Sequence, residues 1–364
     1  YLNLKNRASG QVLPKLIISQ KTSHSYENGI SEDTLKILNQ HINEGQQALL
    51  YLNKKGWAPV LSCLECNWSA KCKNCSVNLV LHKNKDDFLL CHFCGYKELP
   101  AQFCKFCGSN RLRLLGIGTE QLEHKISRII PAARIIRIDK QLVKKKKEFD
   151  DCLRKIENGD VDIIIGTQIL TKGHDFTKVT LVIAVEIESY LKHPDFRASE
   201  RLFQSLLQVS GRAGRHPKQS KNYQEPVFIT EVLDPDNDFL KDLSSANYIE
   251  FAEKLITERK TWNLPPFINL ATINLTHSNE VILRRETNRI LEELTNLIPD
   301  SEKSNVKFSG PLKVFPERVS KKYRSRILLE ADGRADLHRI INTIKATIMN
   351  TKVNTIIDVD PIDF

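Results

Sequence analysis

The sequence has no apolar run long enough to cross a bilayer. Its longest, Val179–Val185, falls far short of the ~20 apolar residues that a membrane-spanning helix needs, and it is typical of a buried strand. The opening residues, YLNLKNRASG, also lack the apolar core of a signal peptide. These absences predict a cytoplasmic protein without a membrane partner.

Methionine is nearly missing as well. Met349 is the single methionine and Tyr1 stands first, so we expect the natural chain to start upstream. The 364 residues suffice for two or three domains, at ~150 residues each. With 41% hydrophobic and 27% charged residues, the composition is that of an ordinary globular protein.

Acidic residues are outnumbered by basic ones, 44 against 54, which leaves a formal net charge of +10. Such an excess favours binding to polyanions, because each neutralised phosphate releases condensed counterions. A generally lysine-rich composition explains the same excess. Charge alone therefore leaves nucleic-acid binding open.

Cysteine, by contrast, is abundant and clustered. Eight of the nine cysteines form four CxxC pairs, a pattern unlike the scattered cysteines of a secreted disulfide framework. The two sulfurs of a CxxC turn can reach one zinc ion, and four thiolates close its tetrahedral shell. The cluster therefore predicts two structural zinc ions. The ninth cysteine, Cys152, lies in a helical pattern that is typical of a core residue.

The four CxxC pairs can be combined in two ways. Consecutive pairing joins Cys63–Cys66 with Cys72–Cys75, but only five residues separate these pairs, which crowds two turns around one ion. Nested pairing avoids the crowding and is preferred. It gives one site from Cys63, Cys66, Cys104 and Cys107, and another from Cys72, Cys75, Cys91 and Cys94.

Around the cysteines, apolar runs of strand length alternate with helical patterns. The runs are QALLYLN, LRLLGIG, ARIIRID, VDIIIGT, VTLVIAVEI and PVFITEV. Continuous apolar strands that alternate with amphipathic helices indicate an α/β fold, with a parallel sheet covered by helices on both faces.

From about residue 245 the pattern changes to the order βαββαβ, which predicts a small separate α+β domain. We expect a linker or the end of a preceding lobe at 1–45, with a helix capped by Ser31. The α/β lobe follows at 46–244, interrupted by a two-zinc module at 60–112, and the α+β domain occupies 245–364.

Two motifs in the α/β part combine glycines with charge. One follows a predicted strand and contains Gly166, Thr167, Gln168, Lys172, Gly173 and Asp175. The other, QVSGRAGR, closes a predicted helix and contains Gln208, Arg212 and Arg215. Loops after the carboxyl ends of parallel strands bind ligands, and an arginine directed at a γ-phosphate stabilises transition-state charge. An exposed basic helix end is the plainer interpretation of RAGR.

The two motifs resemble motifs V and VI of superfamily 2 helicases. The position of the cysteines, together with FRASERLFQ, ERKTWNLPPF, GPLKVFPERVSKKYRSR and IDVDPIDF, is similar to the bacterial replication-restart (primosomal) helicase family. The similarity runs from about residue 45 to the end. It implies a RecA-like second helicase lobe that carries the zinc module.

The resemblance also implies an activity, that of an ATP-dependent 3′–5′ DNA helicase. Such an enzyme recognises stalled or abandoned replication forks and initiates primosome assembly. Gln208, Arg212 and Arg215 would act on ATP and Mg²⁺, and residues 166–175 would couple the nucleotide to DNA. The implied partners are forked and single-stranded DNA, single-strand-binding protein and other primosome proteins. The protein would be a monomer associated with the nucleoid.

The sequence departs from that family in one respect. Neither a GxxxxGK[ST] loop nor a DExH box is present, and phosphoryl transfer depends on both. We therefore expect a fragment or split-gene product that is catalytically incomplete alone. The alternative function is a non-enzymatic, zinc-dependent scaffold for DNA binding and primosome assembly.

A last candidate site lies in RVSKKYRSR, which interleaves an aromatic residue with cations. This combination suits single-stranded nucleic acid, because cations bind phosphates and aromatic rings stack on bases. The candidate DNA contacts are Lys321, Lys322, Tyr323 and Arg324.

Overall fold

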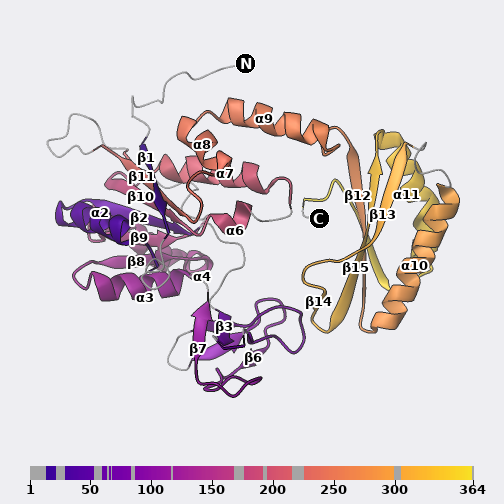
Figure 1. The fold of residues 1–364 in the computed structure, drawn as a ribbon, viewed down its shortest axis with the longest axis horizontal. Coiled ribbons are helices and arrows are strands. Elements are labelled where there is room, and N and C mark those ends of the chain that lie inside the picture. Colours follow the sequence, from indigo (N-terminus) through magenta and orange to yellow (C-terminus); the bar gives the residue numbers. More distant parts are fainter. Residues whose placement is uncertain are drawn as a thin grey trace. The chain divides into compact units, whose positions relative to one another are not determined.

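The computed structural model describes residues 14–21, 29–52, 60–63, 65–66, 68–82, 87–115, 118–167, 176–191, 195–214, 225–298 and 305–362. The chain forms two compact units (Figure 1). Unit 1 comprises Tyr1–Ala58 and Gly116–Glu253, and unit 2 comprises Pro59–Leu115 and Lys254–Phe364. The cysteine-rich segment thus belongs to the same unit as the C-terminal domain.

Unit 1 is built on a six-stranded parallel sheet in the order β1-β11-β10-β2-β9-β8. Its strands are β1 (Lys15–Gln20), β2 (Gln47–Leu52), β8 (Ile135–Ile138), β9 (Ile163–Gly166), β10 (Val179–Val185) and β11 (Val227–Val232). The central strands β2, β9 and β10 are buried along their whole length. This burial explains their continuous apolar sequences, and the predicted parallel α/β fold is confirmed.

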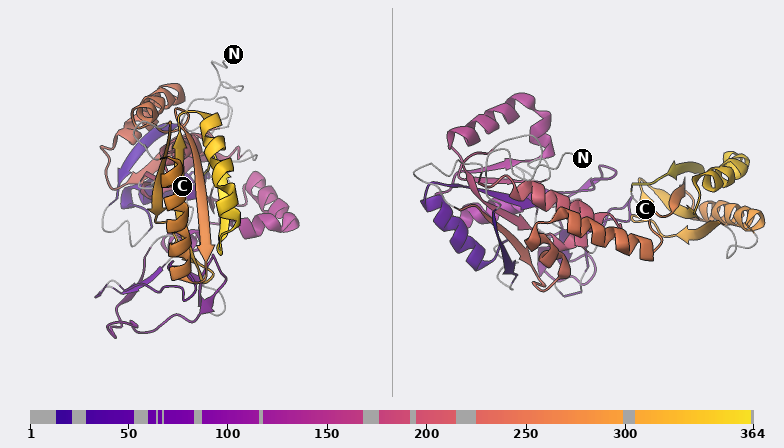
Figure 2. Two further views of the ribbon diagram at one scale, coloured as in Figure 1. Left: turned by 90° about the vertical axis from the view of Figure 1, so that its right-hand side faces the viewer. Right: turned by 90° about the horizontal axis from the view of Figure 1, so that it is seen from above.

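Helices cover this sheet. They are α2 (Glu32–Asn43), α3 (Thr119–Ile129), α4 (Lys140–Lys144), α5 (Lys146–Asn158), α6 (Glu188–Leu191), α7 (Ala198–Ser210), α8 (Asp238–Ser245) and the first part of α9 (Tyr248–Thr261). Leu38 of α2 and Leu122 of α3 share one core with Leu50 and Ile165 of the sheet. Helix α7 contacts β10 on the opposite side (Figure 2). In the described part of the chain, no helix combines the length and apolar character needed to cross a membrane.

Two segments differ from the sequence expectation. LRLLGIG was expected in the parallel sheet, but its residues Leu112–Leu115 form β7, which pairs antiparallel with β3 (Val60–Cys63) in unit 2. Residues 15–20, expected in a linker, form the edge strand β1 beside β11. A strand's partner comes from a distant part of the chain, so the local pattern does not reveal it.

Unit 2 contains two antiparallel sheets. The cysteine-rich module has the order β6-β5-β4-β3-β7, with β4 (Val80–His82), β5 (Phe88–Leu90) and β6 (Lys97–Glu98). The C-terminal sheet has the order β13-β15-β12-β16, and β14 pairs with β15. Its strands are β12 (Asn269–His277), β13 (Val306–Leu312), β14 (Arg318–Val319), β15 (Lys322–Ala331) and β16 (Asn354–Val359).

Two helices, α10 (Glu280–Leu297) and α11 (Arg334–Met349), complete the C-terminal domain. They pack on one face of its sheet, where Ile290 and Ile344 join a core with Ile273 and Leu329. Apart from the short β14, the order of elements is the expected βαββαβ.

A buried carboxyl group connects strand β11 of the parallel sheet to α2. Glu231 of β11 is fully buried and accepts a hydrogen bond from the Ser31 backbone N–H at 2.6 Å. The Ser31 hydroxyl in turn caps α2 by accepting from the Thr34 N–H at 3.2 Å. Burial raises the pKa of the Glu231 carboxyl, although Ser31 and Thr34 donate to it and Lys21 is near.

We predict that Glu231→Gln reduces the pH dependence of stability. The folded chain holds the Glu231 proton more tightly than the unfolded chain does. The contribution of this proton is therefore complete below the unfolded pKa, near 4.5, and is lost as pH rises through the raised folded pKa. Glutamine has no proton to lose, so the free energy of unfolding of the variant, relative to wild type, should rise between pH 4.5 and 7.5.

Urea unfolding at several pH values measures this difference. Glu225→Gln, at an exposed position before β11, is the matched control. A constant difference between wild type and Glu231→Gln across the range would contradict the prediction.

Candidate metal centres and motor motifs

The four CxxC turns share one backbone closure. In each, the N–H of the first cysteine donates to the carbonyl oxygen five residues later, at 2.7–2.9 Å. The donor–acceptor pairs are Cys63 and Trp68, Cys72 and Val77, Cys91 and Tyr96, and Cys104 and Ser109. Gly95 and Gly108 follow the last two turns at φ +74° and +75°, a conformation that glycine adopts without strain.

The eight sulfurs gather in the nested arrangement. Cys63, Cys66, Cys104 and Cys107 form one group, and Cys72, Cys75, Cys91 and Cys94 form the other; within each group the sulfurs lie within 4.8 Å of one another. The separations of Cys63 from Cys107, Cys66 from Cys104, and Cys72 from Cys94 are each 3.6 Å. Four sulfurs bound to zinc at ~2.3 Å are ~3.8 Å apart, whereas a disulfide needs ~2.05 Å. Both groups therefore fit tetrahedral zinc, with no open position for catalysis.

Thiol acidity within each group is uneven. Burial raises the pKa of Cys66 and of Cys72 to about 12. Burial acts in the same direction on Cys104, but backbone N–H donors outweigh it and lower that pKa to about 6. Crowded thiols cannot all ionise together unaided. A divalent ion takes the place of their protons and holds all four as thiolates.

The QVSGRAGR motif is fixed at the carboxyl end of α7. The Gly214 N–H donates to the Val179 carbonyl at 3.0 Å. Gly214 has φ +75°, and a Cβ there would lie 2.5 Å from Pro226, so only glycine fits. Arg212 is buried, and burial lowers the pKa of its guanidinium, whereas Gln208 is exposed. Arg215 lies outside the described residues.

The other motif begins at the opposite end of the strands. Gly166 ends β9 and is aligned through Tyr51 of β2 with Ala184 of β10. Gly214, in contrast, is bonded to Val179 at the start of β10. Ala184 lies five positions after Val179, roughly 16 Å along a strand. The structure therefore does not bring Gly166 and Thr167 to the end where QVSGRAGR is anchored. Gln168, Lys172, Gly173 and Asp175 lie outside the described residues.

Sequence reasoning missed a charged cluster at the carboxyl ends of β1 and β10. The Lys21 ammonium lies 3.3 Å from Glu186 and 3.0 Å from Glu188, and its side chain is almost fully buried. Burial by itself lowers the pKa of Lys21, but the two carboxylates outweigh it and raise that pKa. The available signal was EIES, directly after the apolar run 179–185, because the carboxyl ends of parallel strands are where α/β folds bind ligands.

The candidate DNA contacts divide into two pairs. Lys321 and Lys322 are exposed. Tyr323 packs against the C-terminal core, and its ring lies 5.7 Å below the Arg318 guanidinium. Arg324 donates to the Pro316 carbonyl at 3.2 Å, and burial lowers its pKa. Of these four candidates, only Lys321 and Lys322 have charged groups that are exposed to solvent.

Comparison with known proteins identifies the family. Three family models match: "Primosomal protein N C-terminal domain" at residues 260–362, "Helicase conserved C-terminal domain" at 89–217, and "PriA DNA helicase Cys-rich region (CRR) domain" at 72–98. The chain belongs to the PriA family. The match to the cysteine-rich region contains Cys72, Cys75, Cys91 and Cys94, and both Cys₄ groups fit structural zinc.

The curated relatives are replication restart proteins PriA. The protein of Haemophilus influenzae is 33% identical over all of this chain and 48% of its own length. That of Bacillus subtilis is 29% identical over 99% and 44%, and that of Rickettsia conorii is 31% identical over 100% and 54%. The chain thus spans about half the length of the PriA proteins that it matches.

We predict two zinc ions per chain, held by sulfur alone. Cys66→Ser should lower the zinc content from two ions to one, because a closed site fails without its fourth thiolate, and it should destabilise the module. Cys152→Ser is the control and should retain both ions, because Cys152 belongs to neither group. Metal analysis of purified protein measures the content, and a wild-type value of one or none would contradict the prediction.

Proposed function

We propose that this chain is the C-terminal half of an ATP-dependent 3′–5′ DNA helicase. The enzyme recognises stalled or abandoned replication forks and starts primosome assembly. One observation carries the proposal: a double Cys₄ module is inserted between β2 and α3 of a parallel sheet whose helix α7 ends in QVSGRAGR. The PriA relatives support it. The protein acts as a monomer in the cytoplasm, at the nucleoid.

The helix end supplies the nucleotide-directed arginines. Arg212 leaves α7 through a turn that the Gly214–Val179 hydrogen bond holds in place. A rigidly placed guanidinium stabilises charge on a γ-phosphate without reorganising during the reaction. In the proposed enzyme the other half of the motor holds ATP and Mg²⁺. The side chains of this chain that act on the bound nucleotide are those of Gln208, Arg212 and Arg215. Gly166, Thr167, Gln168, Lys172, Gly173 and Asp175 couple the nucleotide to DNA from the segment that follows β9.

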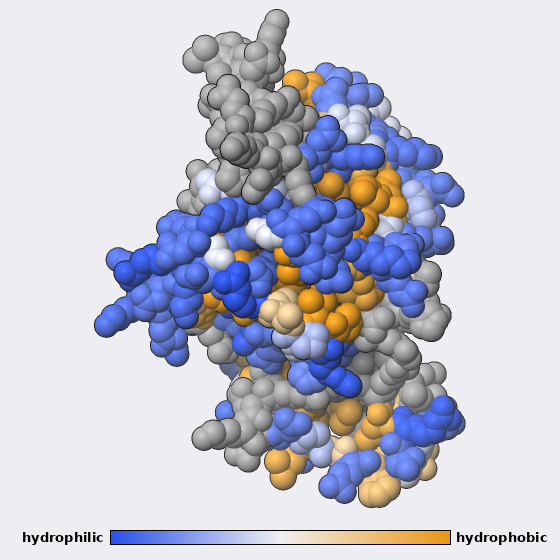
Figure 3. Space-filling model, turned by 90° about the vertical axis from the view of Figure 1, so that its left-hand side faces the viewer, coloured by the Kyte–Doolittle hydropathy of each residue, from blue (hydrophilic) through white to orange (hydrophobic). Residues whose placement is uncertain are grey.

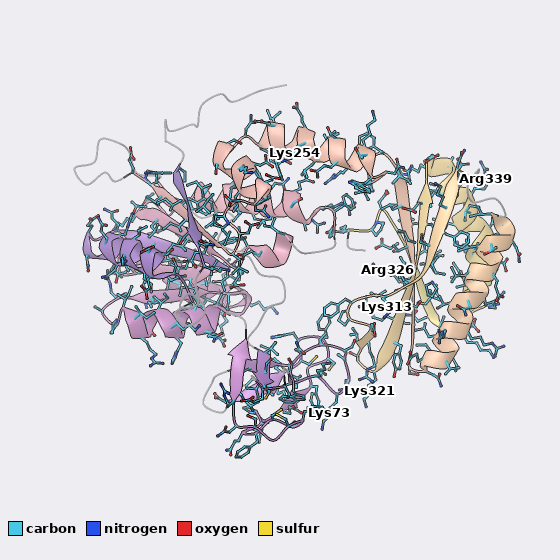
Figure 4. All side chains as sticks on the ribbon, in the orientation of Figure 1. Lys73, Lys254, Lys313, Lys321, Arg326 and Arg339 are labelled. Atoms are coloured by element: carbon cyan, nitrogen blue, oxygen red, sulfur yellow. The ribbon has the colours of Figure 1, made fainter. Side chains whose placement is uncertain are left out.

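The C-terminal domain contributes a basic surface for forked or single-stranded DNA. Lys321 lies in the turn before β15 and Lys322 begins that strand; both are exposed. Lys73 of the cysteine-rich module is exposed beside Lys321 (Figure 4). The Lys321 N–H donates to the carbonyl of Asn74, the neighbour of Lys73, which brings these charges together. Tyr323 and Arg324 are half-buried and hold the exposed lysines of this surface in position.

A non-enzymatic assembly role is favoured by a different feature. The cysteine-rich module exposes large apolar side chains, and Figure 3 shows apolar surface in the lower part of the molecule. They are Phe93, Leu99, Phe103 and Phe106. Exposed apolar groups of this size suit contacts with protein partners, here single-strand-binding protein or other primosome proteins. This role is compatible with the helicase and becomes the whole function if the motor proves inactive.

We predict that the chain alone shows no DNA-stimulated ATP hydrolysis, because the phosphate-binding and magnesium-binding motifs are absent from its sequence. In a full-length protein that supplies both motifs, Arg215→Lys should lose most of the turnover, because lysine lacks the planar fork. Zinc content and DNA binding should stay at the wild-type level. Steady-state ATPase assays with and without DNA test both statements.

Arg128→Lys, an exposed position on α3, is the matched control and should leave turnover unchanged. Turnover by the chain alone that is abolished by Arg215→Lys would overturn the first statement. Full activity of Arg215→Lys in the longer protein would overturn the second.

We predict DNA binding that is independent of sequence and strongly salt-dependent. Affinity for single strands should fall with a log–log slope of about −0.7 per phosphate contact. Replacing both Lys321 and Lys322 by alanine should flatten this slope by about 1.4. The double variant Lys345→Ala, Lys352→Ala removes the same charge from other exposed positions and should leave the slope unchanged. Equal slopes for the two double variants in fluorescence anisotropy titrations would exclude the proposed surface.

A further inference from the structure

The turn between β14 and β15 is bonded to one zinc-binding turn, that of Cys72 and Cys75. The Ser320 N–H donates to the Cys75 sulfur at 3.1 Å, and the adjacent Lys321 N–H donates to the Asn74 carbonyl at 2.8 Å. Figure 4 shows Lys321 and Lys73 from the two segments close together. The C-terminal domain therefore reaches a metal ligand directly.

The residues before this turn extend the contact. The Arg318 N–H donates to the Ser76 hydroxyl at 2.7 Å, and the Ser76 N–H donates back to the Arg318 carbonyl at 2.9 Å. The Arg318 guanidinium also donates to the Lys73 carbonyl at 3.0 Å. Val319 packs against the apolar core of the cysteine-rich module. Residues 318–321 thus hold the 73–76 backbone on several sides.

The turn itself is strained. Ser320 and Lys321 have φ +50° and +66°, in the two central positions of a two-residue hairpin loop that favour asparagine and glycine. Side chains of L-residues are disfavoured in this region. The conformation directs both N–H groups at the Cys72–Cys75 turn, and these hydrogen bonds offset the strain.

The contact distinguishes the Cys72–Cys75 turn from the Cys91–Cys94 and Cys104–Cys107 turns. Gly95 and Gly108 follow the Cys91–Cys94 and Cys104–Cys107 turns in the left-handed conformation, but Ser76 follows Cys75 and bonds to Arg318. Other backbone N–H donors to cysteine sulfur are local, such as Asn74 to Cys72 and Phe106 to Cys104, and the Asn74 side-chain amide reaches Cys94 within the same module. Ser320 donates its backbone N–H to a cysteine sulfur from the C-terminal domain, 245 residues away in sequence.

We propose that the β14–β15 turn is an outer-shell element of the Cys72–Cys75–Cys91–Cys94 zinc site. Zinc at this site and docking of the C-terminal domain on the cysteine-rich module stabilise each other. An N–H directed at a ligand sulfur stabilises the thiolate that the metal requires, and only metal-bound sulfur keeps the position that Ser320 needs. Because the coupling is reciprocal, losing either partner weakens the other. The inference does not depend on the helicase function.

Site-resolved zinc loss tests the proposal in the zinc-loaded 364-residue chain. The chain is mixed with a zinc chelator, alkylated for timed intervals and analysed by mass spectrometry, which reports each CxxC peptide separately. Ser320→Pro lacks the N–H and cannot adopt positive φ, so alkylation at Cys72, Cys75, Cys91 and Cys94 should accelerate about tenfold. Alkylation at Cys63, Cys66, Cys104 and Cys107 should keep its wild-type rate.

Ser320→Gly is the matched control, because it keeps the N–H and relieves the strain; its rates should equal or fall below those of wild type. Arg318→Ala leaves the turn backbone intact and removes the guanidinium, with its bond to the Lys73 carbonyl and its contact with the Tyr323 ring, so it should accelerate the same four cysteines about threefold. It also serves if Ser320→Pro does not fold.

Amide hydrogen exchange on the wild-type chain tests the reverse effect, that of zinc on the β14–β15 turn, and needs no variant. Removing zinc should speed exchange at Ser320 and Lys321 at least tenfold, while the α10 and α11 amides of the same domain stay protected. Two outcomes would overturn the proposal: Ser320 and Lys321 exchange rates that ignore zinc, or equal acceleration of both cysteine groups in Arg318→Ala.

Discussion

Zinc–thiolate bonding is the interaction on which the middle of this chain depends. The cysteine-rich module has a small apolar core, and Cys72, Cys75 and Cys91 are themselves part of it. A core of this size does not offset the chain entropy of a segment of this length, so the metal supplies the missing folding free energy. The module enters and leaves through β3 and β7, which pair with each other. The parallel sheet can therefore continue from β2 to α3 without disruption.

Zinc–thiolate bonding also affects the C-terminal domain, because the Ser320 N–H donates to the Cys75 sulfur. The sheet and two helices of this domain have their own core, which contains none of the eight clustered cysteines. What the metal fixes is the conformation of residues 73–76, and with it the acceptors for Arg318, Ser320 and Lys321. Two segments more than 200 residues apart thus gain a defined contact. A basic surface made from Lys73 and Lys321 exists only while that contact holds.

Sequence reasoning succeeded where one property dominates. Buried central strands must be apolar throughout, so the sequence alone predicted β2, β9 and β10 as strands. The crowding of two CxxC turns five residues apart predicted the nested grouping of the cysteines. It failed where partners are distant. Nothing in the sequence around Leu112–Leu115 names β3 as its partner. Likewise, the cations of RVSKKYRSR look equivalent until the fold half-buries Arg324 and uses the Ser320 and Lys321 amides as donors.

The position of the two motor motifs follows from topology rather than from their residues. Helix α7 runs antiparallel to the strands that it covers, so its carboxyl end returns to the starting end of β10, where Gly214 meets Val179. Gly166 closes β9 at the other end. Because the two motifs begin at opposite ends of the sheet, their backbones cannot contact the same phosphate group. The arrangement instead separates nucleotide contact from coupling to DNA. Arg212 lies at one end of the sheet. At the other end, beside Lys21, Glu186 and Glu188, begins the segment that is proposed to couple the nucleotide to DNA.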